Sequence, residues 1–231
     1  MRHFRWQLLI VLITGLVVGL ILVFQRSATP LALESTPSPV TGGSFTEALA
    51  GEIIRLNPAL DRFNQPDRDV DRLIFSSLIK FDSRGLPVGD LAADWEVSSE
   101  GTRYVVNLRE NAVWHDGTPL TSQDVLYTVS LLQSSSSLVP EDLRNFWQQI
   151  QAAALSDLSL EFSLPNSFAP FLDYLTFQVL PSHLLGNLSL DELVDHPFNL
   201  APIGTGPYRF KEFQVADGKI SGVSLEAFEY Y

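Results

Sequence analysis

The stretch WHDGTPLTSQDV, from Trp114 to Val125, gathers a histidine, two aspartates, two threonines and a serine. A histidine beside a carboxylate can take and return a proton, and a nearby hydroxyl can act as a nucleophile. These residue types would suit a hydrolase that uses His115 with Asp116 or Asp124. Each of them also has a structural use, which depends on the elements around it.

Local backbone needs account for most of these side chains. Thr121 followed three residues later by Asp124 matches the capping box that begins a helix. Asp116 and Gly117 form a turn pair, in which glycine supplies a positive φ. Only His115 is left over, and a histidine without a paired nucleophile is more often a structural hydrogen-bonding group than a base. The stretch is therefore predicted to be scaffold, and the hydrolase is the less favoured hypothesis.

The sequence contains no cysteine, which excludes disulfides, thiolate nucleophiles, cysteine zinc sites and a lipid-modified N-terminal cysteine. The four histidines have no H-x-x-x-H spacing that would place two metal ligands on one helical face: His3, His115, His183 and His196. The block PIGTG lacks the G-K-[ST] ending and the helix start of a phosphate loop. We therefore expect no metal, no nucleotide and no other cofactor.

The chain is acidic, with 27 Asp and Glu against 15 Lys and Arg and a formal net charge of −12. Arg2, Arg5 and Arg26 all precede residue 30, so the remainder is more acidic still. Nucleic acid binding requires clustered cations that neutralise phosphates, and none occur beyond the N-terminal segment. The 45% of hydrophobic residues are enough for one sizeable domain or two small ones, with a solvated acidic surface and no nucleic acid partner.

Residues 1–26 are predicted to target the membrane, because two arginines precede an apolar run from Leu8 to Phe24. As a helix, residues 8–24 would span roughly 26 Å, between a long signal-peptide core and a short membrane-spanning helix. A signal peptidase site is poorly matched, so we favour an uncleaved anchor over a cleaved signal. The arginines place the N-terminus in the cytoplasm and the acidic remainder outside.

Residues 27–43 are rich in Pro, Ser and Thr and show no apolar periodicity. This composition is typical of a flexible tether between an anchor and a folded body. A disordered remnant beside a cleaved signal would have the same composition, so both interpretations stay open.

From residue 44 the sequence changes to short strands, turns and helical patches. We expect a strand over residues 45–49 and a helix that presents one apolar face over residues 70–78. Apolar and polar residues alternate on both sides of the turn SSEG, which predicts an antiparallel hairpin over residues 95–108. Two further strands are expected over residues 160–164 and 208–213.

Four blocks of the sequence together resemble the peptide- and nickel-type substrate-binding proteins of bacterial ABC importers. They are IIRLNP, the long block SLIKFDSRGLPVGDLAADWEVSSEGTRYVVNLRENAVWHDGTPLTSQDV, VLPSHLL and PIGTGPYRF. The resemblance implies an α/β (mixed α+β) fold of the two-lobed periplasmic-binding-protein type. Residues 44–231 would supply mainly the first lobe, with the second lobe absent from this sequence.

The resemblance also implies an extracytoplasmic receptor, not an enzyme, that captures a peptide or similar small solute for ABC permease subunits in the membrane. It places first-lobe ligand contacts around IIRLNP, FSSLI and TFQVLP, at Leu56, Asn57, Ser76, Phe177 and Gln178. Leu56 and Phe177 also suit a plain core. Ser76-Ser77 stands where similar proteins often carry an acidic residue and a glycine. A membrane-anchored sensing or interaction module on the same fold is the alternative function.

Overall fold

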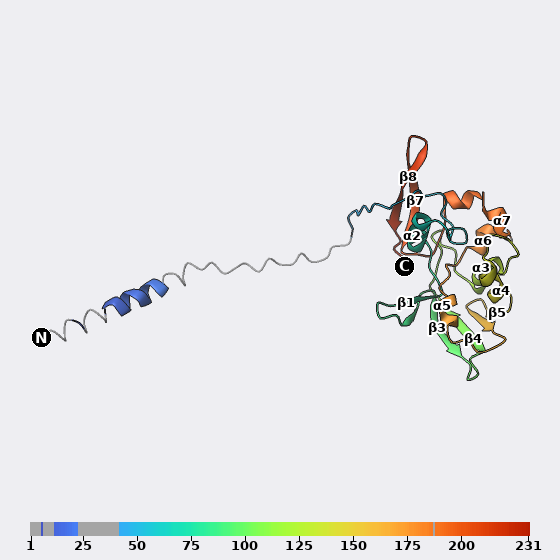
Figure 1. Ribbon diagram of the computed structural model, residues 1–231, viewed down its shortest axis with the longest axis horizontal. Helices are drawn as coiled ribbons and strands as arrows, with labels where there is room; N and C mark the ends of the chain where they lie inside the picture. Colours follow the sequence, from blue (N-terminus) through green and yellow to red (C-terminus); the bar gives the residue numbers. More distant parts are fainter. Residues whose placement is uncertain (1–5, 7–11, 23–41, 187) are drawn as a thin grey trace. The chain divides into compact units, whose positions relative to one another are not determined.

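The computed structural model describes residue 6 and residues 12–22, 42–186 and 188–231 (Figure 1). The chain divides into two compact units, residues 1–47 and 48–231. In the first unit, residues 12–22 are helical. Apart from residue 6, the rest of the predicted membrane segment and the predicted tether up to residue 41 lie outside the described residues. None of the helices in the described ranges combines the length and the apolar character needed to cross a bilayer.

A four-stranded antiparallel sheet forms one part of the second unit (Figure 1). Its strands run in the order β3 (Ala92–Val97), β4 (Arg103–Leu108), β6 (Ser159–Ser163) and β5 (Gln151–Ser156). Apolar residues alternate along β4 and β6, and cross-strand partners such as Tyr104 with Phe162 and Val106 with Leu160 are all buried. The predicted hairpin and the strand over residues 160–164 are confirmed.

Helices cover the buried face of this sheet and complete its core. Helix α3 (Ser122–Leu132) contacts β5 and the short helix α4 (Glu141–Trp147). The rings of Trp147, Phe162 and Phe171 pack against one another with centroids 5.5–6.3 Å apart, and α5 (Phe171–Tyr174) contributes the last of them. Such large apolar side chains supply most of the free energy of burial.

A second core lies around α2 (Gln65–Ile74). It includes buried side chains from α6 (Ser182–Leu185), α7 (Leu190–Leu193) and the 3₁₀ turn η1 (Pro197–Leu200). The long hairpin of β7 (Tyr208–Ala216) and β8 (Lys219–Ala227) contacts α2 (Figure 1). The small hairpin of β1 (Ile79–Phe81) and β2 (Pro87–Gly89) turns at Gly85, whose φ is 75°.

The strand predicted over residues 208–213 is confirmed, and a bulge explains its imperfect alternation. The register of β7 against β8 shifts between Phe210 and Glu212. An extra residue in one strand turns the following side chains to the other face. Phe210 and Phe213 therefore contact each other, with ring centroids 4.9 Å apart, although they are three residues apart.

Two sequence-based predictions are wrong. Residues 45–49 form no strand, and Phe45 is 88% exposed. None of the described strands pairs with this segment, and a strand requires such a partner for its backbone hydrogen bonds. The helix predicted to reach Leu78 ends at Ile74, because Phe75 is already extended and the Ile74 carbonyl accepts a hydrogen bond from Gly206 N–H at 2.7 Å.

Candidate functional site

His115 is bound at both ring nitrogens by the loop that contains PIGTG. Its Nδ1 accepts a hydrogen bond from Gly204 N–H at 3.2 Å, and its Nε2 donates to Gly206 O at 3.0 Å. This pattern requires the neutral tautomer with the proton on Nε2. Burial lowers the pKa of His115, and the ring edge packs on Phe228. The imidazole therefore has no free nitrogen with which to act as a base.

The glycines of PIGTG serve close backbone packing. A β-carbon on Gly204 would lie 2.0 Å from Ile74 O, and one on Gly206 would lie 2.5 Å from Leu73 O. Only residues without a side chain let this loop approach the C-terminal end of α2. Close packing against α2 is therefore sufficient to explain Gly204 and Gly206, and no phosphate-binding role is needed.

Asp124 connects two helix starts, one of which is the predicted capping box in WHDGTPLTSQDV. It forms the predicted capping box with Thr121, whose N–H donates to Asp124 Oδ2 at 2.9 Å. The other oxygen, Oδ1, accepts from Ser182 N–H at 2.8 Å and from the Ser182 hydroxyl at 2.6 Å. Both carboxylate oxygens are thus occupied inside the fold, where a buried charge needs such partners.

Three of the five residues predicted to contact a ligand are buried, and one of them, Ser76, is 3% exposed. Leu56 and Asn57 are fully buried. The Asn57 amide donates to Asn199 Oδ1 at 2.9 Å and accepts from Ala59 N–H at 3.0 Å. Neither Leu56 nor Asn57 lines either of the two cavities described next.

Phe177 and Gln178 line a cavity of about 210 Å³, which we call the Phe177 cavity. The turn before α2, α2 itself, α3, α4 with the segment that leads into it, and α7 supply the other walls, which consist of Pro58, Ala59, Asp61, Arg62, Arg68, Thr128, Leu131, Leu132, Leu138, Val139, Pro140, Leu143 and Leu190. Most of the lining is apolar, with charged groups from Asp61, Arg62 and Arg68. Apolar walls with a few polar groups are typical of small-molecule sites.

Two polar atoms at the Phe177 cavity lack hydrogen-bond partners. These are Gln178 Nε2, a donor, and Asp61 Oδ2, an acceptor, and both atoms are buried. Burial raises the pKa of Asp61 to about 6, against the opposing attraction of Arg68. Unpartnered buried polar atoms are uncommon in folded proteins because each costs free energy.

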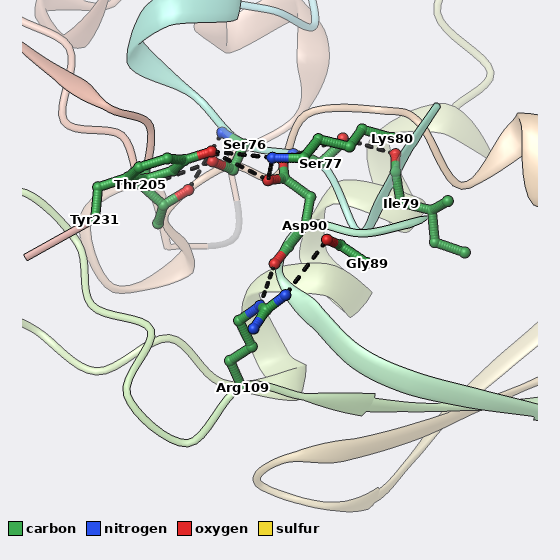
Figure 2. Close-up of polar contacts among 9 residues, drawn as sticks. All are labelled: Ser76, Ser77, Ile79, Lys80, Gly89, Asp90, Arg109, Thr205 and Tyr231. Atoms are coloured by element: carbon green, nitrogen blue, oxygen red, sulfur yellow. Dashed lines mark hydrogen bonds and ion pairs between the residues drawn. The ribbon is translucent and has the colours of Figure 1, made fainter. Parts of the chain in front are cut away.

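Ser76 lines a second cavity of about 240 Å³, which we call the Ser76 cavity. The charged groups there are already paired with protein atoms. Lys80 Nζ lies 2.9 Å from Asp90 Oδ1, and the Tyr231 hydroxyl donates to the same oxygen at 3.2 Å. Figure 2 shows the Arg109 guanidinium directed at two backbone carbonyls, Asp90 O at 2.6 Å and Gly89 O at 3.4 Å. This cavity therefore offers fewer unmet polar groups than the Phe177 cavity.

A short backbone pairing connects the walls of the two cavities. Ser77 and Gln178 form an isolated antiparallel bridge, and Val179 N–H donates to Ser76 O at 3.0 Å. The structure thus brings Ser76, Phe177 and Gln178 into one region, although about a hundred residues separate them in sequence. Sequence reasoning missed Asp61, because no motif or periodicity marks a single aspartate in a turn. Among the described residues, no group of three or more acidic, histidine or cysteine side chains is arranged to hold a metal ion.

The sequence profile of the bacterial extracellular solute-binding proteins, family 5 Middle, matches residues 87–231. The oligopeptide-binding protein AppA of Bacillus subtilis is 28% identical over 196 residues, which are 82% of this chain and 35% of AppA. The chain therefore spans about a third of the length of this relative.

Solved structures agree in fold. NikZ from Campylobacter jejuni, in complex with Ni(L-His), has a TM-score of 0.65 and 31% identity over 78% of this chain and 34% of its own. AppA from Bacillus subtilis, in complex with a nonapeptide, has a TM-score of 0.67 and 27% identity over 78% of this chain and 35% of its own. The predicted mixed α/β fold of the periplasmic-binding-protein type is confirmed for the part of the fold that this chain contains.

Proposed function

Because the chain belongs to the bacterial extracellular solute-binding proteins of family 5, we propose that it takes part in capturing a peptide or similar small solute for an ABC-type import permease. The similar AppA is an oligopeptide-binding protein and was solved with a nonapeptide. NikZ was solved with a nickel complex of histidine. A ligand built from amino acids is common to both, and this supports a peptide-like solute here.

The single observation that carries the proposal is the composition of the Phe177 cavity. Its apolar walls would gain free energy by covering the apolar part of a solute. The unpartnered Gln178 amide would donate to a ligand oxygen, such as a peptide carbonyl, and would lose its cost of burial on binding. Phe177 and Gln178 are thus the proposed contact residues, with Ser76 at the neighbouring cavity.

Leu56 and Asn57 have a supporting part in this proposal. Asn57 is bonded to Asn199 and to Ala59, which itself lines the Phe177 cavity. Its buried amide would therefore hold the turn at residues 58–62 in the shape that the cavity needs.

Capture fits the chemistry of the fold better than hydrolysis does. The His115 imidazole is bound at both nitrogens, and the Asp124 carboxylate accepts hydrogen bonds at both oxygens. Neither side chain is free to move a proton at a substrate.

The place of action proposed is outside the cytoplasm, as in the family. Residues 8–24 would anchor the chain to the cytoplasmic membrane or act as a signal, and residues 27–43 would tether the folded body near the permease. The domain division is part of the same proposal, with residues 44–231 supplying mainly a first lobe.

Native mass spectrometry of the purified 231-residue chain with a mixture of two- to nine-residue peptides tests the proposal. We expect bound peptide, and a Phe177→Ala variant should weaken its affinity about tenfold or more. Phe45→Ala is the matched control, because Phe45 is exposed and lines neither cavity. Phe177 also packs on Trp147, so circular dichroism must confirm that the variant is folded. Failure of every peptide to bind, with a folded chain, would refute peptide capture.

A further inference from the structure

Asp90 is the centre of a group of hydrogen bonds at the wall of the Ser76 cavity (Figure 2). Its Oδ2 accepts from Ser77 N–H at 3.0 Å. Its Oδ1 accepts from Lys80 Nζ at 2.9 Å and from the Tyr231 hydroxyl at 3.2 Å. The Asp90 side chain is only 11% exposed, so these bonds are stronger than they would be in water. Lys80 and Tyr231 thus fix the carboxylate that binds the backbone of Ser77.

The bond to Ser77 lies on one side of the short segment between α2 and β1. The other side of that segment pairs with residues next to the Phe177 cavity. Ser77 forms the bridge with Gln178, and Val179 N–H donates to Ser76 O at 3.0 Å. The Asp90 carboxylate takes the place of a strand carbonyl here, because it accepts the backbone N–H of Ser77. The position of the Gln178 backbone therefore depends on a segment that Asp90 holds.

The Gln178 amide has to be directed accurately if it is to bind a solute. Its Nε2 is buried at the Phe177 cavity and has no acceptor among the described residues. A hydrogen bond weakens steeply when its donor is misdirected. With no protein acceptor to orient this nitrogen, its direction is set by the backbone of Gln178 and by the packing around the side chain. A small shift of that backbone would reduce the bond to a solute.

We propose that Asp90 is a positioning residue for solute capture, which directs the Gln178 amide into the Phe177 cavity by holding Ser77. This inference rests on the proposed capture of peptides and adds a residue that acts from outside the cavity. Asp90 lines the Ser76 cavity and not the Phe177 cavity, so its effect on a solute there passes through Gln178. Residues that act in series in this way have non-additive effects on affinity.

Amide hydrogen exchange, followed by NMR on the 231-residue chain, tests the positioning role without any solute. Asp90→Ala removes both acceptor oxygens, so the Val179 N–H should exchange about tenfold faster relative to the Leu160 N–H. Leu160 lies in β6 between two strands and reports any general loss of stability. An equal effect on both amides would overturn the positioning role. If Asp90→Ala does not fold, Lys80→Met takes its place here and in the titrations, with a smaller effect in the same direction, because it removes one of the two donors to Oδ1.

Isothermal titration calorimetry tests the effect on capture, with the tightest binder of the two- to nine-residue peptide mixture as the probe. Asp90→Ala and Gln178→Ala should each weaken its affinity about threefold to tenfold. In the Gln178→Ala background, Asp90→Ala should change the affinity by less than about twofold, because Asp90 acts through Gln178. Glu96→Ala is the matched control, since it also removes an acidic side chain, is exposed on β3 and lines neither cavity.

The outcomes separate this inference from the proposed function. Unchanged affinity in folded Asp90→Ala would overturn the positioning role and leave peptide capture standing. Fully additive losses for Asp90→Ala and Gln178→Ala would do the same, because they would show that Asp90 acts independently of Gln178. No binding of any peptide to the folded chain would overturn both proposals.

Discussion

His115 and the backbone of Gly204 are joined by two hydrogen bonds, one through the His115 backbone and one through its imidazole, although the two residues lie far apart in the sequence. The backbone N–H of His115 donates to Gly204 O at 2.9 Å, and Gly204 N–H donates to His115 Nδ1 at 3.2 Å. The loop at residues 202–206 is thus held between His115 on one side and the end of α2 on the other.

Replacement of His115 should lower the free energy of unfolding and should not change solute binding by the folded molecules. His115→Ala leaves Gly204 N–H and Gly206 O without their side-chain partners, so the free energy of unfolding should fall by about 1–3 kcal/mol. His183→Ala is the control, because His183 forms a partly exposed pair with Asp116 and a ring contact with Trp114, and its loss should cost about 1 kcal/mol. Urea melts measure both, and equal losses would contradict the central role of His115.

The stability of the chain should depend on pH in opposite directions through His115 and Asp61. Burial lowers the pKa of His115, so the unfolded state binds more protons and stability falls as the pH drops below about 6.5. Burial raises the pKa of Asp61 to about 6, so the folded state binds more protons, and stability falls as the pH rises from about 4 to about 6. Above about pH 6, where Asp61 is ionised in the folded state, its burial lowers the free energy of unfolding by on the order of 3 kcal/mol.

Asp61→Asn separates the two contributions. The variant should be more stable than the wild type at pH 7 and should lose the part of the pH dependence between about 4 and 6. Burial still raises the pKa of Asp67 in this variant, whereas the pKa of Asp71, which burial raises first and the charge of Asp61 raises further, should fall toward its ordinary value. Urea melts from pH 4 to pH 8 would show this, and parallel curves for variant and wild type would refute the burial cost at Asp61.

Gly204→Ala should be among the most destabilising alanine substitutions in the second unit. The new β-carbon would meet the Ile74 carbonyl at 2.0 Å, so either the loop or the end of α2 has to move. A loss of about 2 kcal/mol or more is expected, as for other overpacked sites. Gly222→Ala in β8 meets only the flexible Gln214 side chain at 3.1 Å and should change thermal stability little. Similar melting temperatures for the two variants would contradict this packing argument.

At the start of α3, replacement of Asp124 should lower the stability more than replacement of Thr121. Thr121→Ala removes one side of the capping box and should cost about 0.5–2 kcal/mol. Asp124→Ala should cost more, because Thr121 N–H and both donors of Ser182 lose their acceptor. Denaturant titrations of the two variants test the order, and the reverse order would show that α6 does not depend on Asp124.

Sequence reasoning located three of the residues around the two cavities and could not tell how each is used. The blocks FSSLI and TFQVLP pointed to Ser76, Phe177 and Gln178, which do line the cavities. Leu56 and Asn57 come from the block IIRLNP, which pointed to ligand contacts in the same way, and both are fully buried. Whether a residue faces a cavity depends on which distant segment covers it, and no local pattern contains that information.

The sequence by itself determined the features that need only a few neighbouring residues. The alternation in β4 and β6, the capping box of Thr121 and Asp124, and the positive φ of Gly85 and Gly117 follow from local backbone geometry. Only the tertiary structure decided where α2 ends, that residues 45–49 form no strand, and that Asp61 lies at a cavity without a donor. Each of these depends on contacts between segments far apart in the chain, such as Gly206 with Ile74, whose pairing is set by the packing of the whole fold.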